Sequence, residues 1–408
     1  MIHRTARVLL LGLLGAWYVV ANVLGPISSL ASISDFVHYY RAGEAILHLK
    51  SPFDDPEFLY PPAVAFLSAP FALLSYVAAR WSWFLISQAC LISAAIIVWR
   101  SLGRGWTAAL TVAAMWALGG AASESVALGQ ITPLLVLLLA IAYSCGSTAQ
   151  GLSIGAGFSL KYVPGALAVA LALRRDMRAL SSFAVAVLVL VAIPWIAIVS
   201  FFSGARTPVS GNYWMGTPAV LSWSVPSVVL RALDPPRDSD HVPHDWEFGN
   251  SGANLHLDAT RRIISLVTAA ATFAIGAVAL ALACGGRLRA EQMPWALAGL
   301  TSLSLAASPV CWTHYELLQY PGLALVIHAA IVHRKWLLTA FAIVCAALLY
   351  PVPVAVLTRY YQGHAGWTAA SPFTLYFWTS IAPIASLALF TLNVWNVWCN
   401  SSKRRWSS

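Results

Sequence analysis

The sequence has very little charge. Only 10% of its 408 residues are Asp, Glu, Lys or Arg, whereas 59% are hydrophobic and the mean hydropathy is +0.73. Soluble globular proteins carry about 25% charged residues. The deficit excludes a soluble enzyme or a soluble binding domain. It predicts an all-α polytopic membrane protein in which residues 1–408 form one transmembrane domain.

Cysteine is also scarce, and the cysteines are not grouped. All six are isolated, and most lie in or beside apolar runs, where cysteine behaves as a small hydrophobe. No C-x-x-C pair and no internal repeat of fixed period occurs, which excludes zinc ribbons, disulfide frameworks and repeat architectures. The net charge is +9, but the basic residues form short clusters between apolar runs, so we expect no nucleic-acid partner.

Apolar runs and basic clusters together predict about twelve membrane crossings. The apolar segment Tyr60–Tyr76 is short and contains three prolines, and counting it as a crossing would place Arg100 and Arg104 outside, against the positive-inside rule. We therefore predict that it lies along the outer interface. Fourteen of the 24 basic residues then fall inside, with only Asp176 and Glu291 among the acids, and both termini are cytoplasmic. The predicted crossings are Val8–Val23, Trp81–Trp99, Trp106–Ala121, Ile131–Cys145, Gly151–Leu160, Val163–Leu173, Leu180–Phe202, Arg262–Ala283, Pro294–Ala307, Leu317–Val332, Trp336–Leu357 and Phe373–Trp398.

Two stretches between these crossings are predicted to be extracytoplasmic. Residues 28–80 form a first outer loop, in which Phe36–Leu47 has apolar residues at helical spacing and predicts an amphipathic juxtamembrane helix. Residues 203–259 form a long outer loop that is rich in Pro, Trp, Asp and His. Its length and aromatic content predict that it is partly ordered and covers part of the protein.

The first outer loop gathers acidic and aromatic candidates. Asp35 stands at the start of the predicted helix, where it fits either a helix cap with Ser34 or a functional carboxylate. Asp54 and Asp55 fit either turn chemistry or a divalent cation; we predict no metal site, and a divalent cation requirement is left open. Tyr60 precedes two prolines and fits an interfacial anchor.

A second group of candidates lies near a break between two apolar half-helices. Lys161 stands between Gly151–Leu160 and Val163–Leu173, and Pro164 breaks the helix there. Broken helices at membrane depth are tolerated where they line a cavity. The lysine fits either snorkelling to the interface or neutralisation of a phosphate. Glu124 and Gln130 are predicted on the same outer side.

A third group closes an apolar run in the segment Ser308–Glu316. His314 stands two residues before Glu316, which is typical of a proton-handling or orienting pair. Trp312 and Tyr315 provide flat surfaces on which sugars stack. The segment lies on the predicted outer side, as do Asp35 and Lys161, and this shared side favours a functional interpretation over an ordinary loop histidine.

With these residues in view, the chain resembles glycosyltransferase family 87, the polyprenol-phosphate-mannose-dependent α-mannosyltransferases of the GT-C class. The matching motifs cover about two thirds of the chain in the family's order: S-D-F-V-H-Y-Y-R-A-G-E-A-I-L, S-P-F with F-L-Y-P-P-A, G-Q-I-T-P-L-L-V-L-L-L-A, L-K-Y-V-P and S-P-V-C-W-T-H-Y. The chain departs from the family in G-Q-I-T-P, where an Asn often follows the Gln-x pair.

The resemblance implies a GT-C fold with juxtamembrane helices in the first outer loop. It also implies that Asp35 is the general base, that His314 supports it or the donor phosphate, and that Lys161 lies near that phosphate. Tyr39, Tyr60, Gln130, Trp312, Tyr315 and Glu316 are predicted to bind donor or acceptor.

The predicted function is transfer of a hexose, which the resemblance implies is mannose, from a polyprenyl phosphate to a glycolipid or cell-envelope glycan. The protein would act at the extracytoplasmic face of a bacterial inner membrane and need no cofactor. Two alternatives stay open. One is a lipid or solute transporter or flippase, and the other is a lipid-linked arabinofuranosyltransferase.

Overall fold

Helices make up nearly all of the structure. The computed structural model describes residues 2–28, 30, 34–55, 58, 60–196, 222–233, 259–363 and 372–402. In these ranges the β-structure is one isolated antiparallel bridge, between Ser222 and Trp312. The α-helices are α1 Ile2–Tyr18, α2 Gly25–Ile27, α3 Phe36–Leu47, α4 Pro62–Ala72, α5 Tyr76–Ser101, α6 Trp106–Leu118, α7 Ala121–Leu128, α8 Thr132–Ser144, α9 Ser147–Leu160, α10 Ala168–Arg174, α11 Met177–Val187, α13 Val225–Leu233, α14 Ala259–Ala283, α15 Met293–Ala307, α16 Tyr320–Val332, α17 Trp336–Leu349, α18 Pro351–Gly363 and α19 Pro372–Ser402.

Tighter and wider helical turns join several of these helices. The 3₁₀ turns are Pro52–Asp54, Val163–Leu167, Ala290–Gln292 and Thr313–Gln319, and the π-helical turns are Val19–Leu24 and Leu188–Ala192.

Seven helical segments in the described ranges are long and apolar enough to cross a membrane. They are Arg4–Ile27, Tyr76–Ser101, Met177–Ile196, Ala259–Ala283, Thr313–Val332, Trp336–Leu357 and Phe377–Asn400. The other five predicted crossings coincide with α6, α8, α9, α15 and the segment Val163–Arg174, all of which are shorter than 18 residues. Such a helix is about 20 Å long, less than the roughly 30 Å of a hydrocarbon core. The all-α polytopic class is confirmed, and the number of twelve crossings stays a prediction.

The outer surface of the bundle is apolar. Leu13, Leu282 and Leu337 are 68%, 76% and 90% exposed, and similar residues stand along α1, α14 and α17. Contiguous exposed apolar surface of this extent is not compatible with water. These helices therefore present their side chains to lipid, as the composition predicts.

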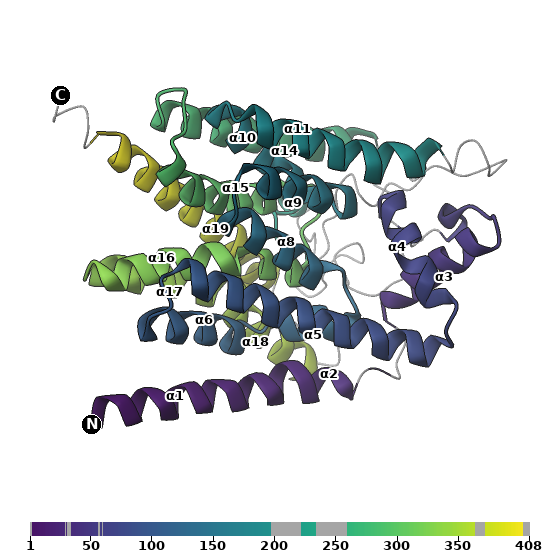
Figure 1. Ribbon diagram of the computed structural model, residues 1–408, viewed down its shortest axis with the longest axis horizontal. Coiled ribbons are helices and arrows are strands. Elements are labelled where there is room, and N and C mark those ends of the chain that lie inside the picture. Colours follow the sequence, from purple (N-terminus) through teal and green to yellow (C-terminus); the bar gives the residue numbers. More distant parts are fainter. Residues whose placement is uncertain are drawn as a thin grey trace.

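Figure 1 shows that the start of α1 and the end of α19 lie at one end of the bundle, which we call the terminal end, and that α3 and α4 lie at the opposite end. Several turns that contain arginine residues are joined by hydrogen bonds at the terminal end. The Leu288 N–H donates to the Leu173 carbonyl at 3.0 Å, and Arg289 Nη2 donates to the Asn400 carbonyl at 2.6 Å. The basic residues around these turns thus share one end with the termini.

The helices α3 and α4 pack closely at the end that we call the α3 end. The prediction of a helix at Phe36–Leu47 is confirmed by α3. Gly43 makes the contact with α4 close, because a Cβ there would lie 2.7 Å from the Ser68 backbone. At 11 residues α4 is about 16 Å long, too short to cross a membrane. The Tyr40 hydroxyl donates to the Leu74 carbonyl at 2.8 Å, which fixes the start of α5 beside α3.

The predicted helix break at Lys161 is confirmed. α9 ends at Leu160, Lys161 is extended with φ −160° and ψ 127°, and a 3₁₀ turn leads into α10. The far ends of α9 and α10 meet, because Ser147 Oγ donates to Asp176 Oδ2 at 2.6 Å. The two half-helices therefore form a hairpin whose apex, Lys161, lies in the interior, one α9 length (about 21 Å) from this junction.

Candidate active site

The Asp35 carboxylate does not cap α3. Asp35 occupies the N-cap position, but its side chain makes no capping hydrogen bond. Its Oδ2 instead accepts a hydrogen bond from Gln130 Nε2, although the two residues are 95 positions apart in the sequence. The partly exposed carboxylate is therefore fixed by tertiary contacts, which fits a functional group better than a local cap.

Gln130 connects three of the predicted site residues. It is only 1% exposed, and its Oε1 accepts hydrogen bonds from the hydroxyls of Tyr39 at 3.1 Å and Tyr60 at 3.0 Å. Because both phenols donate to the oxygen, the amide nitrogen is directed to Asp35. The sequence places Gln130 only on the predicted outer side, whereas in the structure it is the centre of this network.

The turn that presents Gln130 depends on glycine. Gly129 ends α7 in the left-handed region with φ +71°, and a Cβ there would lie 2.7 Å from Phe36 Cβ and 3.0 Å from Arg80 Nη1. A side chain at this position would both strain the backbone and push apart α3 and α5. The turn thus sets the distance between Gln130 and the start of α3.

Replacing Gly129 by Ala is expected to lower the free energy of unfolding by more than the ~1 kcal/mol that left-handed backbone costs a non-glycine residue. Thermal unfolding in detergent measures this effect. Gly103→Ala is the matched control, because Gly103 has φ +95° but nothing within 4 Å of its Cβ position. Equal destabilisation of both variants would show that the contacts with Phe36 and Arg80 are unimportant.

Lys161 is a buried cation without a hydrogen-bond partner. It is 7% exposed, and its Nζ makes no hydrogen bond to any described residue. The Nζ lies 3.3 Å from the ring centroid of Tyr315 and 5.6 Å from that of Tyr60, so two aromatic faces replace part of its hydration. Snorkelling does not account for this position, because the ammonium does not reach the surface. Its N–H groups are available to an anion.

His314 lies beside the lysine. It is 4% exposed in the 3₁₀ turn before α16, and its ring packs edge-on against Tyr315 with centroids 4.8 Å apart. Its Nε2 has no hydrogen-bond partner among the described residues. His314 and Lys161 interact electrostatically. The histidine thus packs on the same tyrosine ring as the lysine, and among the described residues no hydrogen bond joins it to Asp35.

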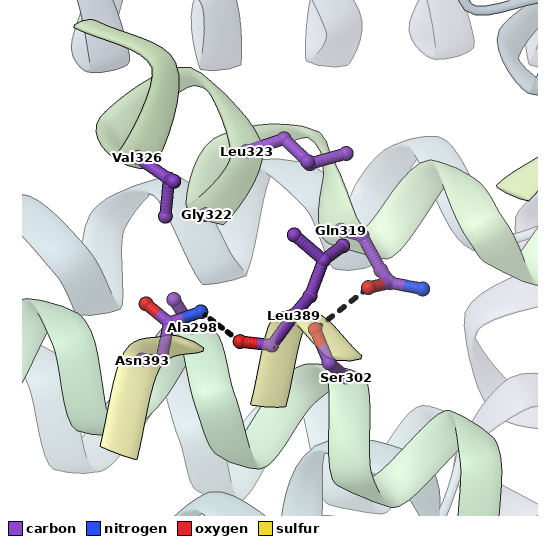
Figure 2. A pocket seen from close by; sticks show the side chains of 8 residues that line it. All are labelled: Ala298, Ser302, Gln319, Gly322, Leu323, Val326, Leu389 and Asn393. Carbon is purple, nitrogen blue, oxygen red and sulfur yellow. Dashed lines mark hydrogen bonds between the residues drawn. The ribbon is translucent and has the colours of Figure 1, made fainter. Parts of the chain in front are cut away.

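The Glu316 side chain is directed elsewhere, and the contact given for Trp312 is a backbone one. Glu316 Oε2 accepts a hydrogen bond from Gln319 Nε2 at 2.5 Å, in the interior between α15, α16 and α19. Figure 2 shows Gln319 bonded to Ser302, at 2.7 Å, beside a small pocket. Trp312 pairs with Ser222 through the isolated bridge. The predicted roles of these two residues in binding substrate gain no support from these contacts.

Part of the long loop predicted at residues 203–259 covers the His314 segment. Its described residues, 222–233, include α13, and the Trp223 N–H donates to the Cys311 carbonyl at 2.7 Å. The Trp223 side chain is fully buried. The remainder of this loop lies outside the described residues.

Glu124 joins α7 to the same segment. Its Oε1 accepts a hydrogen bond from Thr313 Oγ1 at 2.6 Å, next to His314. Burial raises the pKa of Glu124, and the hydrogen bond from Thr313 offsets part of that rise. The negative charge of Asp35 adds to the increase, which shows that both carboxyl groups belong to one electrostatic environment.

The contacts of the Asp54-Asp55 pair favour a structural role in the turn over a metal site. Asp55 Oδ2 lies 2.9 Å from His38 Nδ1 and 3.9 Å from Arg41 Nη1, so it links the turn after α3 back to that helix. Asp54 is exposed. Among the residues that the structure describes, no three His, Cys, Asp or Glu side chains are grouped as metal ligands.

One buried charged residue, Arg80, was not among the site residues predicted from the sequence. Arg80 is fully buried in α5, and its Nη2 donates to the carbonyls of Val126 at 3.2 Å and Ala127 at 2.5 Å. The predicted crossing begins at Trp81, so Arg80 is the last residue of the predicted outer loop 28–80. Because α5 begins at Tyr76, Arg80 lies four residues inside a long apolar helix. A charge in that position is a signal of a buried functional residue, but it can be recognised only when the start of the helix is known.

Comparison with known proteins supplies the class of activity. Residues 58–247 match the model of glycosyltransferase family 87, a range that contains Tyr60, Gln130 and Lys161. The polyprenol-phosphate-mannose-dependent alpha-(1-2)-phosphatidylinositol mannoside mannosyltransferase of Mycobacterium tuberculosis is 26% identical over 359 residues, which cover 81% of this chain and 76% of the relative. Together with the helical membrane fold, these similarities indicate a membrane glycosyltransferase that is similar to family 87.

Proposed function

We propose that the protein transfers mannose from a polyprenyl phosphate to a glycolipid or cell-envelope glycan, with inversion at the anomeric carbon. The donor and the glycolipid acceptor class are those in the name of the mycobacterial relative. The observation that carries the proposal is the pairing of an accessible carboxylate with a buried cation. Asp35 and Lys161 are linked through Gln130 and Tyr60, and their charges interact.

The chemistry needs one base and one cation. Asp35 takes the proton of the acceptor hydroxyl as its oxygen bonds to the anomeric carbon of the sugar. On the opposite face the bond from that carbon to the phosphate oxygen breaks, and polyprenyl phosphate leaves with one more negative charge. Lys161 stabilises this charge in a water-poor environment. A β-linked donor then gives an α-linked product, and the second carboxylate of glycosidases is not required.

We further propose that the α3 end faces the extracytoplasmic side of a bacterial inner membrane and that both termini are cytoplasmic. The support is the distribution of charge. Arg174, Arg287 and Arg289 belong to turns at the terminal end, whereas Asp35, Asp55 and Glu124 belong to the α3 end or its contacts. Basic residues concentrate on the cytoplasmic side of membrane proteins.

Sugar transfer from radiolabelled polyprenyl-phosphate mannose tests the function directly. Liposomes containing the purified protein and phosphatidylinositol mannosides are expected to yield a labelled lipid from which an α-mannosidase releases the label. Product from a lipid-linked arabinofuranose donor, and none from the mannose donor, would overturn the choice of sugar. Movement of the labelled lipid between leaflets without any product would support a transporter instead.

A further inference from the structure

The guanidinium of Arg80 contacts the immediate neighbours of two site residues. Its Cζ lies 5.8 Å from the ring centroid of Phe36, the residue after Asp35. Its Nη1 would lie 3.0 Å from a Cβ on Gly129, the residue before Gln130. Arg80 is thus located behind the hydrogen bond that joins Asp35 to Gln130.

Arg80 also holds the end of α7. Its Nη2 bonds the Val126 and Ala127 carbonyls, which belong to the last turn of that helix. The carbonyls at the end of a helix carry partial negative charge, so a cation there is favourable. Because the Gly129-Gln130 turn follows directly, this contact determines where the Gln130 amide lies.

Stability alone does not explain this arginine. Its Nε and Nη1 have no hydrogen-bond partner among the described residues, although the side chain is fully buried. An unsatisfied buried donor and a charge without an ion-pair partner both lower the free energy of unfolding. A feature that reduces stability in this way is typical of a functional site.

We propose that Arg80 is a positioning residue, which holds Gln130 through α7 and stabilises the ionised form of Asp35 by its positive charge. This inference rests on the proposed role of Asp35 as the general base. Among the described residues, the charged or titratable groups that interact with Asp35 include, besides Arg80, Tyr39 of α3, Tyr60, Glu124 of α7 and Lys161 of the hairpin. Arg80 and Lys161 are the cations of this set, and Arg80 is the one next to Gln130.

Two variants separate the roles of charge and shape. Arg80→Gln removes the charge but keeps an N–H donor, and Arg80→Lys keeps the charge but loses the planar fork. Arg100→Gln is the matched control, because Arg100 is exposed near the other end of α5.

In Arg80→Gln the acid limb of the kcat–pH profile is expected to move up by about one pH unit, because Asp35 loses a nearby positive charge. In Arg80→Lys the limb stays in place while kcat falls about 10- to 100-fold from misplacement of Gln130.

A measurement that needs no turnover accompanies the kinetics. A hydrophobic carbodiimide modifies protonated carboxyl groups, so mass spectrometry of labelled Asp35 across a pH series reports its protonation. The pH of half-labelling should rise by about one unit in Arg80→Gln and match the wild type in Arg80→Lys and Arg100→Gln.

The two measurements distinguish failure of the inference from failure of the proposed function. An unchanged half-labelling pH in Arg80→Gln, or a shifted one in folded Arg80→Lys, overturns the role of Arg80 whatever the wild type transfers. Should Arg80→Gln fail to fold, the kcat of Arg80→Lys decides, because an unchanged kcat in that variant overturns the positioning role. Absence of transfer by the wild type contradicts the proposed function only.

Discussion

Replacing Asp35 by Asn is expected to lower kcat for sugar transfer about 10³-fold, the middle of the range for loss of a general base. The amide cannot take the proton of the acceptor hydroxyl. It still offers an oxygen to Gln130 Nε2, so the network with Tyr39 and Tyr60 persists and the fold is retained. Single-turnover transfer of labelled mannose measures the loss without interference from product release.

The matched control for this variant is Asp54→Asn, which removes an exposed carboxylate from the same outer loop. It should transfer sugar at the wild-type rate. Asp35→Asn with more than about a tenth of wild-type kcat would contradict the assignment, because the loss would be too small for a general base. A lower thermal unfolding temperature in Asp35→Asn, with no change in Asp54→Asn, would instead indicate that Asp35 has a structural role.

Replacing Lys161 by Met is expected to separate activity from stability. The leaving phosphate loses its counter-charge, and kcat/KM should fall about 10²- to 10³-fold, as when one preorganised electrostatic donor is removed. The thermal unfolding temperature should stay the same or rise, because Met keeps the length of the side chain and removes a buried charge that lacks an ion pair. Transfer kinetics and thermal unfolding on one preparation test both parts.

Lys50→Met serves as the control, because Lys50 is exposed just after α3 and belongs to the same end of the bundle. Neither its activity nor its stability should change. Normal transfer by Lys161→Met together with a large loss of stability would show that the lysine holds the hairpin to Tyr60 and Tyr315 and does not serve the donor.

Local features of this protein were predictable because their causes are local. The helix at Phe36–Leu47 follows from apolar spacing, and the break at Lys161 follows from the proline three residues later. Gln130 could not be ranked in the same way. Its partners are 70 to 95 positions away, and a single sequence contains no information on which distant residues meet.

The prediction that His314 and Glu316 act as a pair rests on their spacing of two residues, and it stays a prediction. In the 3₁₀ turn that contains both, Glu316 is directed to Gln319, while His314 packs against Tyr315. Arg80 was missed for a related reason, because a charge near the start of a helix is distinguishable from a flanking charge only when burial is known.

The hairpin of α9 and α10 has a consequence for how the nascent chain enters the membrane. Neither half is long enough for the translocon to insert by itself, since insertion selects about 20 consecutive apolar residues. The lysine at its apex also depends on Tyr315, which is synthesised 154 residues later. The contact between Lys161 and Tyr315 therefore forms only after more than three quarters of the chain has been synthesised, so completion of the candidate site is a late event in the biogenesis of the protein.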